Sequence, residues 1–335
     1  MDEMFELMPT LCGTIFCFGK LTGLTHNSKK FKDLIDLTHE DWINIPKGRE
    51  RQILMRYAKI ARKFTISYAT CICGLLFSYL LLPLSVFVLD SATTQNETGP
   101  RKLLHRAEYF VDQEKYYYML LSIEVTAYVV SGMIVIAIDA IYFLLLEHIC
   151  GMQNVLCHCL ENLTVRDKLR WVDNDQLNMI NGVDRRVRHC IQLDKRIREY
   201  VDIVEATFAT SILVDIGFGF MFHTSTCIMI VIRKGRLTEL AQFVSLLILQ
   251  SFRFFLISWT GQEVIDHSSI IPIATYNAMW YQMPIEIQKN LMLLIVRSQK
   301  FSQLTIAKFY VINLENFSAV MKTSVTYCTV MTSIR

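Results

Sequence analysis

The chain has 335 residues, of which 52% are hydrophobic and 19% are charged, and its net charge is +3. A soluble domain usually carries about 25% charged residues, so this composition favours a helical membrane bundle over soluble domains. The small net charge, with no basic cluster interleaved with aromatic residues, argues against nucleic acid as a partner.

The first apolar run extends from Leu7 to Gly19 and is only 13 residues long. A helix needs about 20 apolar residues to cross the hydrocarbon core of a bilayer. The run therefore looks like a helix that has lost its outer end. We predict a span near residues 4–25, and we expect close relatives to begin with more sequence upstream.

Four longer apolar runs follow at residues 66–90, 119–146, 206–232 and 240–261, and a fifth, much more polar run occupies 305–335. Each is long enough to cross a membrane. The fold class predicted is an all-α, polytopic transmembrane bundle. We divide it into a bundle at 1–262, a cytoplasmic segment at 263–304 and a final helix at 305–335.

The distribution of Lys and Arg predicts which loops face the cytoplasm. The stretches 26–65 and 151–200 hold ten and nine of these residues, whereas 91–118 holds four. Positive charge accumulates on the cytoplasmic side, so the two basic loops are expected inside and the C-terminus outside. Asn96, followed by Glu97 and Thr98 in the predicted outer loop, is a glycosylation candidate.

The inner loops also contain helical patterns. In 26–65, Phe31, Leu34, Ile35 and Leu37 predict an amphipathic helix, with a second helix starting after Pro46-Lys47-Gly48. Apolar residues scattered among the charges of 163–200 predict that the helices extend well below the membrane.

The cysteines offer little support for a metal site. Cys150, Cys157 and Cys159 lie near His148 and His158 in sequence, but no Cys-x-x-Cys spacing accompanies them. We expect thiols at the inner end of a helix, open to palmitoylation, and no metal or cofactor. The sequence also lacks the common protease, hydrolase and phosphate-loop motifs, so we predict no enzyme and no catalytic residues.

The three middle spans, at 119–146, 206–232 and 240–261, contain four charged residues: Glu124, Asp139, Asp215 and Arg253. Charges in lipid are costly and usually functional or paired. Asp139 and Asp215 are candidates for a structural hydrogen-bonding centre, a proton relay or an ion site. The first is favoured, because neither residue repeats in the pattern that a transport pathway needs.

The final run carries polar residues at offsets of three and four, which places them on one face of a helix. They are Glu315, Ser318, Lys322, Thr326, Thr329 and Ser333. A polar stripe of this length in lipid must face water or other polar helices. It either lines a pore formed by several subunits or forms a polar seam buried inside one subunit.

The same region resembles the C-terminal signature of insect odorant receptors, and upstream stretches agree. The matching residues in the C-terminal part are Arg297-Ser298-Gln299-Lys300, Ala307-Lys308-Phe309, Leu314-Glu315, Phe317, Val320, Val325-Thr326-Tyr327 and Val330. Those upstream are Glu40-Asp41-Trp42, Asp139-Ala140, Glu147-His148-Ile149-Cys150, Gly261, Ser268 and Trp280. The resemblance spans nearly the whole chain and is strongest over 260–335.

The resemblance implies a seven-helix subunit with its N-terminus inside and its C-terminus outside, whose first helix is missing here and whose second is trimmed. It implies assembly with an olfactory co-receptor subunit into a tetrameric, odour-gated, non-selective cation channel. Its expected surroundings are membrane lipids in the plasma membrane of the sensory dendrites of olfactory neurons, and its expected ligand is a small volatile odorant.

The resemblance also implies roles for particular residues. It places a hydrophobic gate at Val330 and Ile334 with Ser333 between them, and the pore stripe at Lys322, Thr326 and Thr329. The odorant pocket of relatives lies in the outer half of the bundle, where the corresponding residues here are Phe77, Leu80, Leu84, Tyr128, Ser131, Phe218 and Phe222. Ordinary helix packing also explains such apolar stripes.

Three other functions are open to a chain of this kind. A gustatory-type channel has the same architecture, but the odorant-type linker and final helix disfavour it. A G-protein-coupled receptor has its C-terminus inside and usually carries Asp-Arg-Tyr and Asn-Pro-x-x-Tyr motifs, which this sequence lacks. An intramembrane enzyme or transporter needs paired polar site residues, which the spans do not provide.

Overall fold

The computed structural model describes residues 2–93, 111–112, 115–163, 176–232, 237–306, 308 and 310–333. These residues are almost entirely helical, and the predicted all-α fold is confirmed. The elements, in chain order, are α1 (Asp2–His26), α2 (Ser28–Asn44), α3 (Arg49–Thr93), α4 (Tyr117–Glu161), α5 (Gln176–Ile232), α6 (Leu237–Asn277), the 3-10 turn η1 (Trp280–Gln282), α7 (Ile285–Ser298), β1 (Thr305–Ile306), β2 (Tyr310–Val311) and α8 (Leu314–Ser333).

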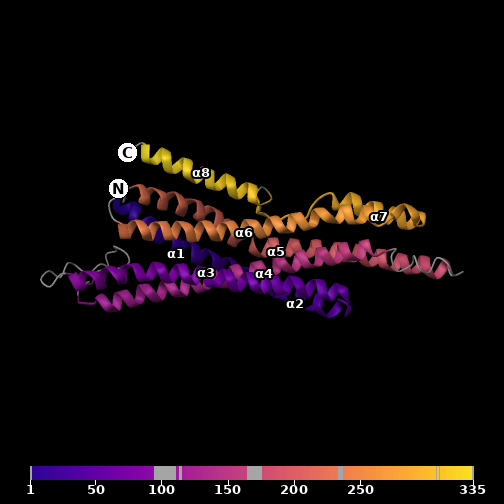
Figure 1. The fold of residues 1–335 in the computed structure, drawn as a ribbon, viewed down its shortest axis with the longest axis horizontal. Helices are drawn as coiled ribbons and strands as arrows, with labels where there is room; N and C mark the ends of the chain where they lie inside the picture. The colour runs from indigo at the N-terminus through magenta and orange to yellow at the C-terminus, as the bar shows by residue number, and fades with distance from the viewer. Residues whose placement is uncertain are drawn as a thin grey trace.

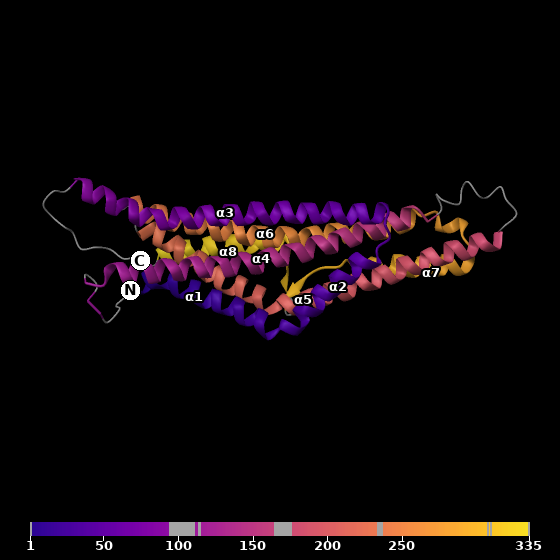
Figure 2. The same ribbon diagram turned by 90° about the horizontal axis from the view of Figure 1, so that it is seen from below.

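The long helices lie side by side in an elongated bundle, with α8 along one edge (Figure 1). Seen from below, α3 runs along one side and α1 and α2 follow the other (Figure 2). The start of α1 and the end of α8 lie at the same end of the bundle (Figure 1). The side of the membrane on which that end lies stays a prediction.

Four helices in the described part of the chain are long and apolar enough to cross a membrane, namely those containing Arg49–Ser78, Tyr117–Glu161, Asn181–Val231 and Phe243–Gln282. α5 alone has 57 residues, which at 1.5 Å per residue is about 85 Å, against a hydrocarbon core of about 30 Å. The prediction that the helices continue well beyond the membrane is therefore confirmed.

The break predicted at the Pro46-Lys47-Gly48 segment is also present. α2 ends at Asn44 and α3 begins at Arg49, because proline lacks the amide proton that a continuing helix would use. The amphipathic face of α2 packs through Leu34, which is fully buried.

α4 is a central helix of the bundle. From Tyr142 to Val155 nearly every side chain is buried, and a helix that is apolar on all sides is stable only when neighbours surround it. α3 packs along it, and α5 and α6 cover its other faces.

The structure corrects the start of the final helix, which was predicted at residue 305. Thr305–Ile306 and Tyr310–Val311 instead form a two-stranded antiparallel hairpin in which Thr305 pairs with Val311 and Ile306 with Tyr310. The turn contains Lys308 in the left-handed conformation, with φ of 64°. The β-branched residues Thr305, Ile306 and Val311 favour strands, and hydropathy alone did not reveal this preference.

Two of the stretches that carried the family resemblance meet in the half of the bundle away from the two termini. Asp41 of α2 accepts a hydrogen bond from Arg196 Nε of α5 at 3.0 Å, and its other carboxylate oxygen lies 3.1 Å from Nε2 of His148 of α4. Arg196 also binds Glu40 at 2.9 Å. This network fixes α2 across α4 and α5.

Candidate functional site

A cluster of four charged side chains occupies the interior of the bundle. Lys20 comes from α1, Asp139 from α4, Asp215 from α5 and Arg253 from α6. All four side chains are at most 4% exposed. The two aspartates and Arg253 were singled out in the sequence, but Lys20 was not.

Each of the two cations contacts both carboxylates. Arg253 donates from Nε to Asp139 Oδ2 at 2.7 Å and from a terminal nitrogen to Asp215. Lys20 bonds Asp139 and lies 3.1 Å from Asp215 Oδ2. Tyr68 of α3 donates its hydroxyl to Asp139 Oδ2 at 2.6 Å. The cluster therefore joins α1, α3, α4, α5 and α6.

An aromatic ring also lies beside the two cations of the cluster. The Arg253 guanidinium carbon lies 4.5 Å from the centroid of the Phe16 ring and the Lys20 nitrogen lies 5.3 Å from it, within the range of cation–π attraction. Two positive and two negative charges leave no net charge, and each carboxylate has two cationic partners. This geometry fits the structural hydrogen-bonding centre favoured for Asp139 and Asp215.

The last helix, α8, packs one face on α5 and α6. Ser324 and Cys328 are buried on that face. The ring of Phe317 lies 5.3 Å from that of Phe254, and Tyr327 lies 5.6 Å from Phe220. These contacts fix the rotation of α8 about its own axis.

The polar stripe of α8 points away from the rest of the subunit. Five of its six members are exposed and Ser318 is half-buried: the exposed ones are Glu315, Lys322, Thr326, Thr329 and Ser333. The alternative of a polar seam buried inside one subunit is therefore wrong for the described chain. Among the predicted gate residues, Val330 is 47% exposed, Ser333 donates its hydroxyl to the Val330 carbonyl at 2.8 Å, and Ile334 lies outside the described residues.

The start of α8 is held by three contacts. The Asn313 side chain accepts the Asn316 amide hydrogen at 2.8 Å, an N-cap interaction that the Asn-x-x-Asn spacing suggests in hindsight. Thr305 of the hairpin donates from its amide and hydroxyl to Glu205 of α5, at 3.0 and 2.8 Å. Gly261 of α6 lies directly beneath the chain that enters α8, so close that a Cβ there would meet the Ile312 carbonyl oxygen at 2.4 Å.

A hollow of about 350 Å³ lies between α5, the hairpin and α8. Phe220, Tyr310 and Thr323 are among its lining residues. The hydroxyl of Tyr310 has no hydrogen-bond partner within the described part of the chain. None of the seven predicted odorant-pocket residues lines this hollow.

The predicted pocket residues lie on three helices. Phe77 of α3 is 63% exposed, and the side chains of Leu80 and Leu84 lie outside the described residues. Tyr128, Ser131, Phe218 and Phe222 are half-buried on α4 and α5. The Ser131 carbonyl lies 3.6 Å from the Cys17 thiol of α1. Asn96 lies outside the described residues.

Sequence and structure comparisons place the chain among known proteins. The profile of the family described as 7tm odorant receptor matches residues 1–325. Odorant receptor 13a of Drosophila melanogaster is 22% identical over 335 residues, covering 95% of this chain and 77% of that protein. Odorant receptor 10 of Aedes albopictus is 28% identical over 152 residues, and this match spans 45% of the chain but only 40% of the relative's length.

Solved structures agree on the fold. The insect olfactory receptor OR5 from Machilis hrabei in complex with eugenol aligns with a TM-score of 0.78 and 16% identity, covering 99% of this chain and 82% of that one. A second structure of that receptor aligns with a TM-score of 0.73 and 14% identity, over 100% of this chain and 82% of that one. At these identities the likeness shows a shared fold.

Proposed function

The chain belongs to the 7tm odorant receptor family, and we propose from this that it is an odorant-binding subunit of a ligand-gated, non-selective cation channel. The observation that carries the channel part of the proposal is the outward polar stripe of α8. Exposed Lys322, Thr326 and Thr329 face hydrocarbon in an isolated subunit, which is unfavourable. Arranging several α8 helices around a central axis puts the same residues in contact with water.

The partners proposed are an olfactory co-receptor subunit, in a heterotetramer, and the surrounding lipids. Val330, Ser333 and Ile334 form the proposed gate, because apolar side chains at a constriction stop conduction by excluding water. α8 supplies the pore and the segment before it, which includes α7, holds the subunits together. The cell site proposed is the plasma membrane of olfactory dendrites, with Asn96 glycosylated outside.

The ligand proposed is a small, largely apolar volatile molecule. The Machilis receptor similar in fold is in complex with eugenol, which is a compound of this class. The pocket proposed lies in the outer half of the bundle and includes Tyr128 and Ser131 of α4 and Phe218 and Phe222 of α5. Phe77, Leu80 and Leu84 of α3 complete the proposed set, although Phe77 points largely outward in the described subunit.

The function is tested by expressing the chain with an olfactory co-receptor in cells that have neither. Volatile odorants are applied to patches in which G-protein signalling is blocked. We expect an odour-evoked cation current that is absent when the co-receptor is expressed alone. A response that disappears with the block would instead indicate a G-protein-coupled receptor, and antibody access to a C-terminal tag only after permeabilisation would agree with it.

A further inference from the structure

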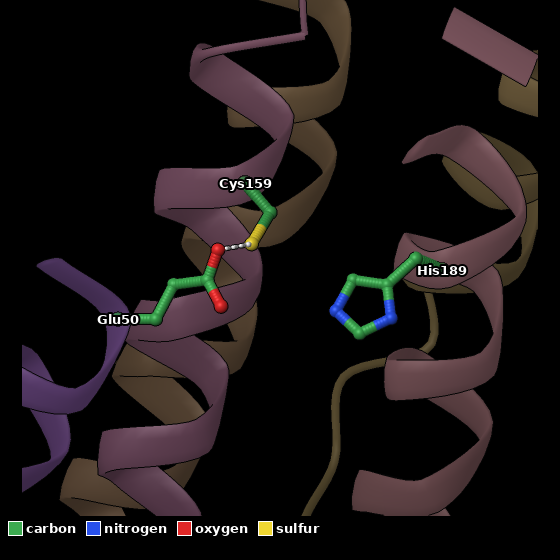
Figure 3. Close-up of side chains that lie close together, drawn as sticks. All are labelled: Glu50, Cys159 and His189. Carbon is green, nitrogen blue, oxygen red and sulfur yellow. Dashed lines mark hydrogen bonds between the residues drawn. The ribbon is translucent and has the colours of Figure 1, made fainter. Parts of the chain in front are cut away.

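Three side chains from separate helices meet near the inner end of the bundle. Glu50 lies in the first turn of α3, Cys159 in the last turns of α4 and His189 in α5. Their carboxylate oxygen, sulfur and ring nitrogen all lie within 4.8 Å of one another. Cys159 donates to Glu50 Oε1 at 3.4 Å, and the His189 ring faces both from the other side of a small gap (Figure 3).

The next residue of α5, Cys190, is 1% exposed but is not among the side chains whose ligand atoms lie within 4.8 Å of one another. Successive residues of a helix do not face the same way, so one thiol, one imidazole and one carboxylate come together where α3, α4 and α5 adjoin. Only Cys159 belongs to the cysteine and histidine group noted in the sequence, because Cys150 and Cys157 are buried elsewhere and His148 binds Asp41.

We propose that Glu50, Cys159 and His189 form a binding site for a zinc ion, with water as the fourth ligand. Zinc prefers thiolate, imidazole and carboxylate ligands in a tetrahedron with bonds of about 2.0–2.3 Å. That geometry places the ligand atoms about 3.5 Å apart, so the three atoms now within 4.8 Å of one another need to close by little more than 1 Å. The half-exposed position gives an ion access from water, since His189 is exposed and Glu50 and Cys159 are half-buried.

Binding would add a link between α3, α4 and α5 at this end of the bundle. The Cys159 thiol releases its proton to water as the ion binds, because thiolate is the ligand form. The charge pattern of the loops predicts that this end of the bundle is cytoplasmic, where thiols stay reduced. The site is independent of the channel proposal, and its test does not require odorant or current.

The test uses the full chain, purified in detergent with reductant, stripped with a chelator and titrated with Zn²⁺ against a chromophoric competitor. We expect one zinc ion per chain and a rise in melting temperature. His189→Ala, an exposed position that folding tolerates, and Cys159→Ser should each weaken binding at least about tenfold, as loss of a ligand requires. Co²⁺ should give a thiolate charge-transfer band that Cys159→Ser removes.

Cys157→Ser is the matched control, because Cys157 lies two residues from Cys159 on the same helix and outside the cluster. It should leave zinc affinity and the cobalt band unchanged. Three results would overturn the proposal: no saturable binding, equal binding by wild type and the Cys159→Ser and His189→Ala variants, or mass spectrometry of thiol-trapped protein showing Cys159 joined to Cys190 or acylated.

Discussion

Arg253→Met is expected to remove most of the folded subunit from the membrane. The substitution leaves Asp139 and Asp215 with Lys20 as their only cationic partner in the cluster, so the buried interior carries a net negative charge. Removing one partner of a buried ion pair typically costs about 3–5 kcal/mol, and the membrane makes solvation of the remaining charge harder. The measurement is the fraction of a fluorescent fusion that is monodisperse after mild extraction, followed across a temperature ramp.

The control for this prediction is a second substitution that restores the charge balance of the cluster. Adding Asp215→Asn to Arg253→Met leaves one positive and one negative charge, Lys20 and Asp139, in the same volume. The double variant should recover a substantial part of the stability lost by the single one, because the two sites share partners and do not act additively. Arg62→Met, at an exposed position of α3, should change little. A double variant no more stable than Arg253→Met would show that the cluster does not act through charge balance.

Gly261→Ala is expected to have the second largest effect, on the attachment of α8. The new Cβ would meet the Ile312 carbonyl oxygen at 2.4 Å and its side chain at 2.8 Å. A backbone atom cannot rotate away, so α6 and the start of α8 must separate. Overpacking of this kind costs about 1–3 kcal/mol, and here it also displaces the helix that carries the polar stripe. Melting temperature and odour-evoked current should both fall.

Gly74→Ala on α3 is the matched substitution, because no atom lies within 4 Å of its added Cβ. Alanine is favoured over glycine in a helix by about 1 kcal/mol, so this variant should be as stable as the wild type or more stable. Equal behaviour of the Gly261 and Gly74 variants would contradict the close contact between α6 and the chain entering α8.

Much of the fold followed from apolar runs and their interruptions. The long runs predicted the helices that became α3 to α6, and the Pro46-Lys47-Gly48 segment predicted the gap between α2 and α3. The stripe of α8 was predicted from spacing alone, but spacing could not say whether it faced outward. The direction of the stripe depends on which residues of the opposite face, such as Ser324 and Cys328, pack against α5.

The charge cluster was only half predictable. Asp139, Asp215 and Arg253 interrupt apolar runs and so attract attention, whereas Lys20 lies just after the short run that ends at Gly19 and interrupts none. Its partner Asp139 is 119 residues away, and a contact of that separation leaves no periodic trace in one sequence. The same reason hid the Glu50, Cys159 and His189 cluster, whose members belong to three helices.

Cysteine accessibility during recording is the most direct test of whether the exposed polar stripe of α8 lines a gated pore. Thr326→Cys and Ser333→Cys are co-expressed with the co-receptor and treated from outside with a charged, membrane-impermeant thiol reagent. Val129→Cys, on the exposed face of α4, and the unsubstituted chain control for reaction elsewhere, including exposed Cys71 and Cys73.

We predict that Thr326→Cys, one helical turn inside Val330, reacts and alters the current only while odorant holds the channel open. Ser333→Cys, between Val330 and Ile334 of the proposed gate, should react faster than Thr326→Cys, because the reagent enters from outside and reaches it first. The controls should show no change in current. Currents unaffected at both α8 positions, under conditions in which a surface cysteine is labelled, would contradict a pore lined by this helix.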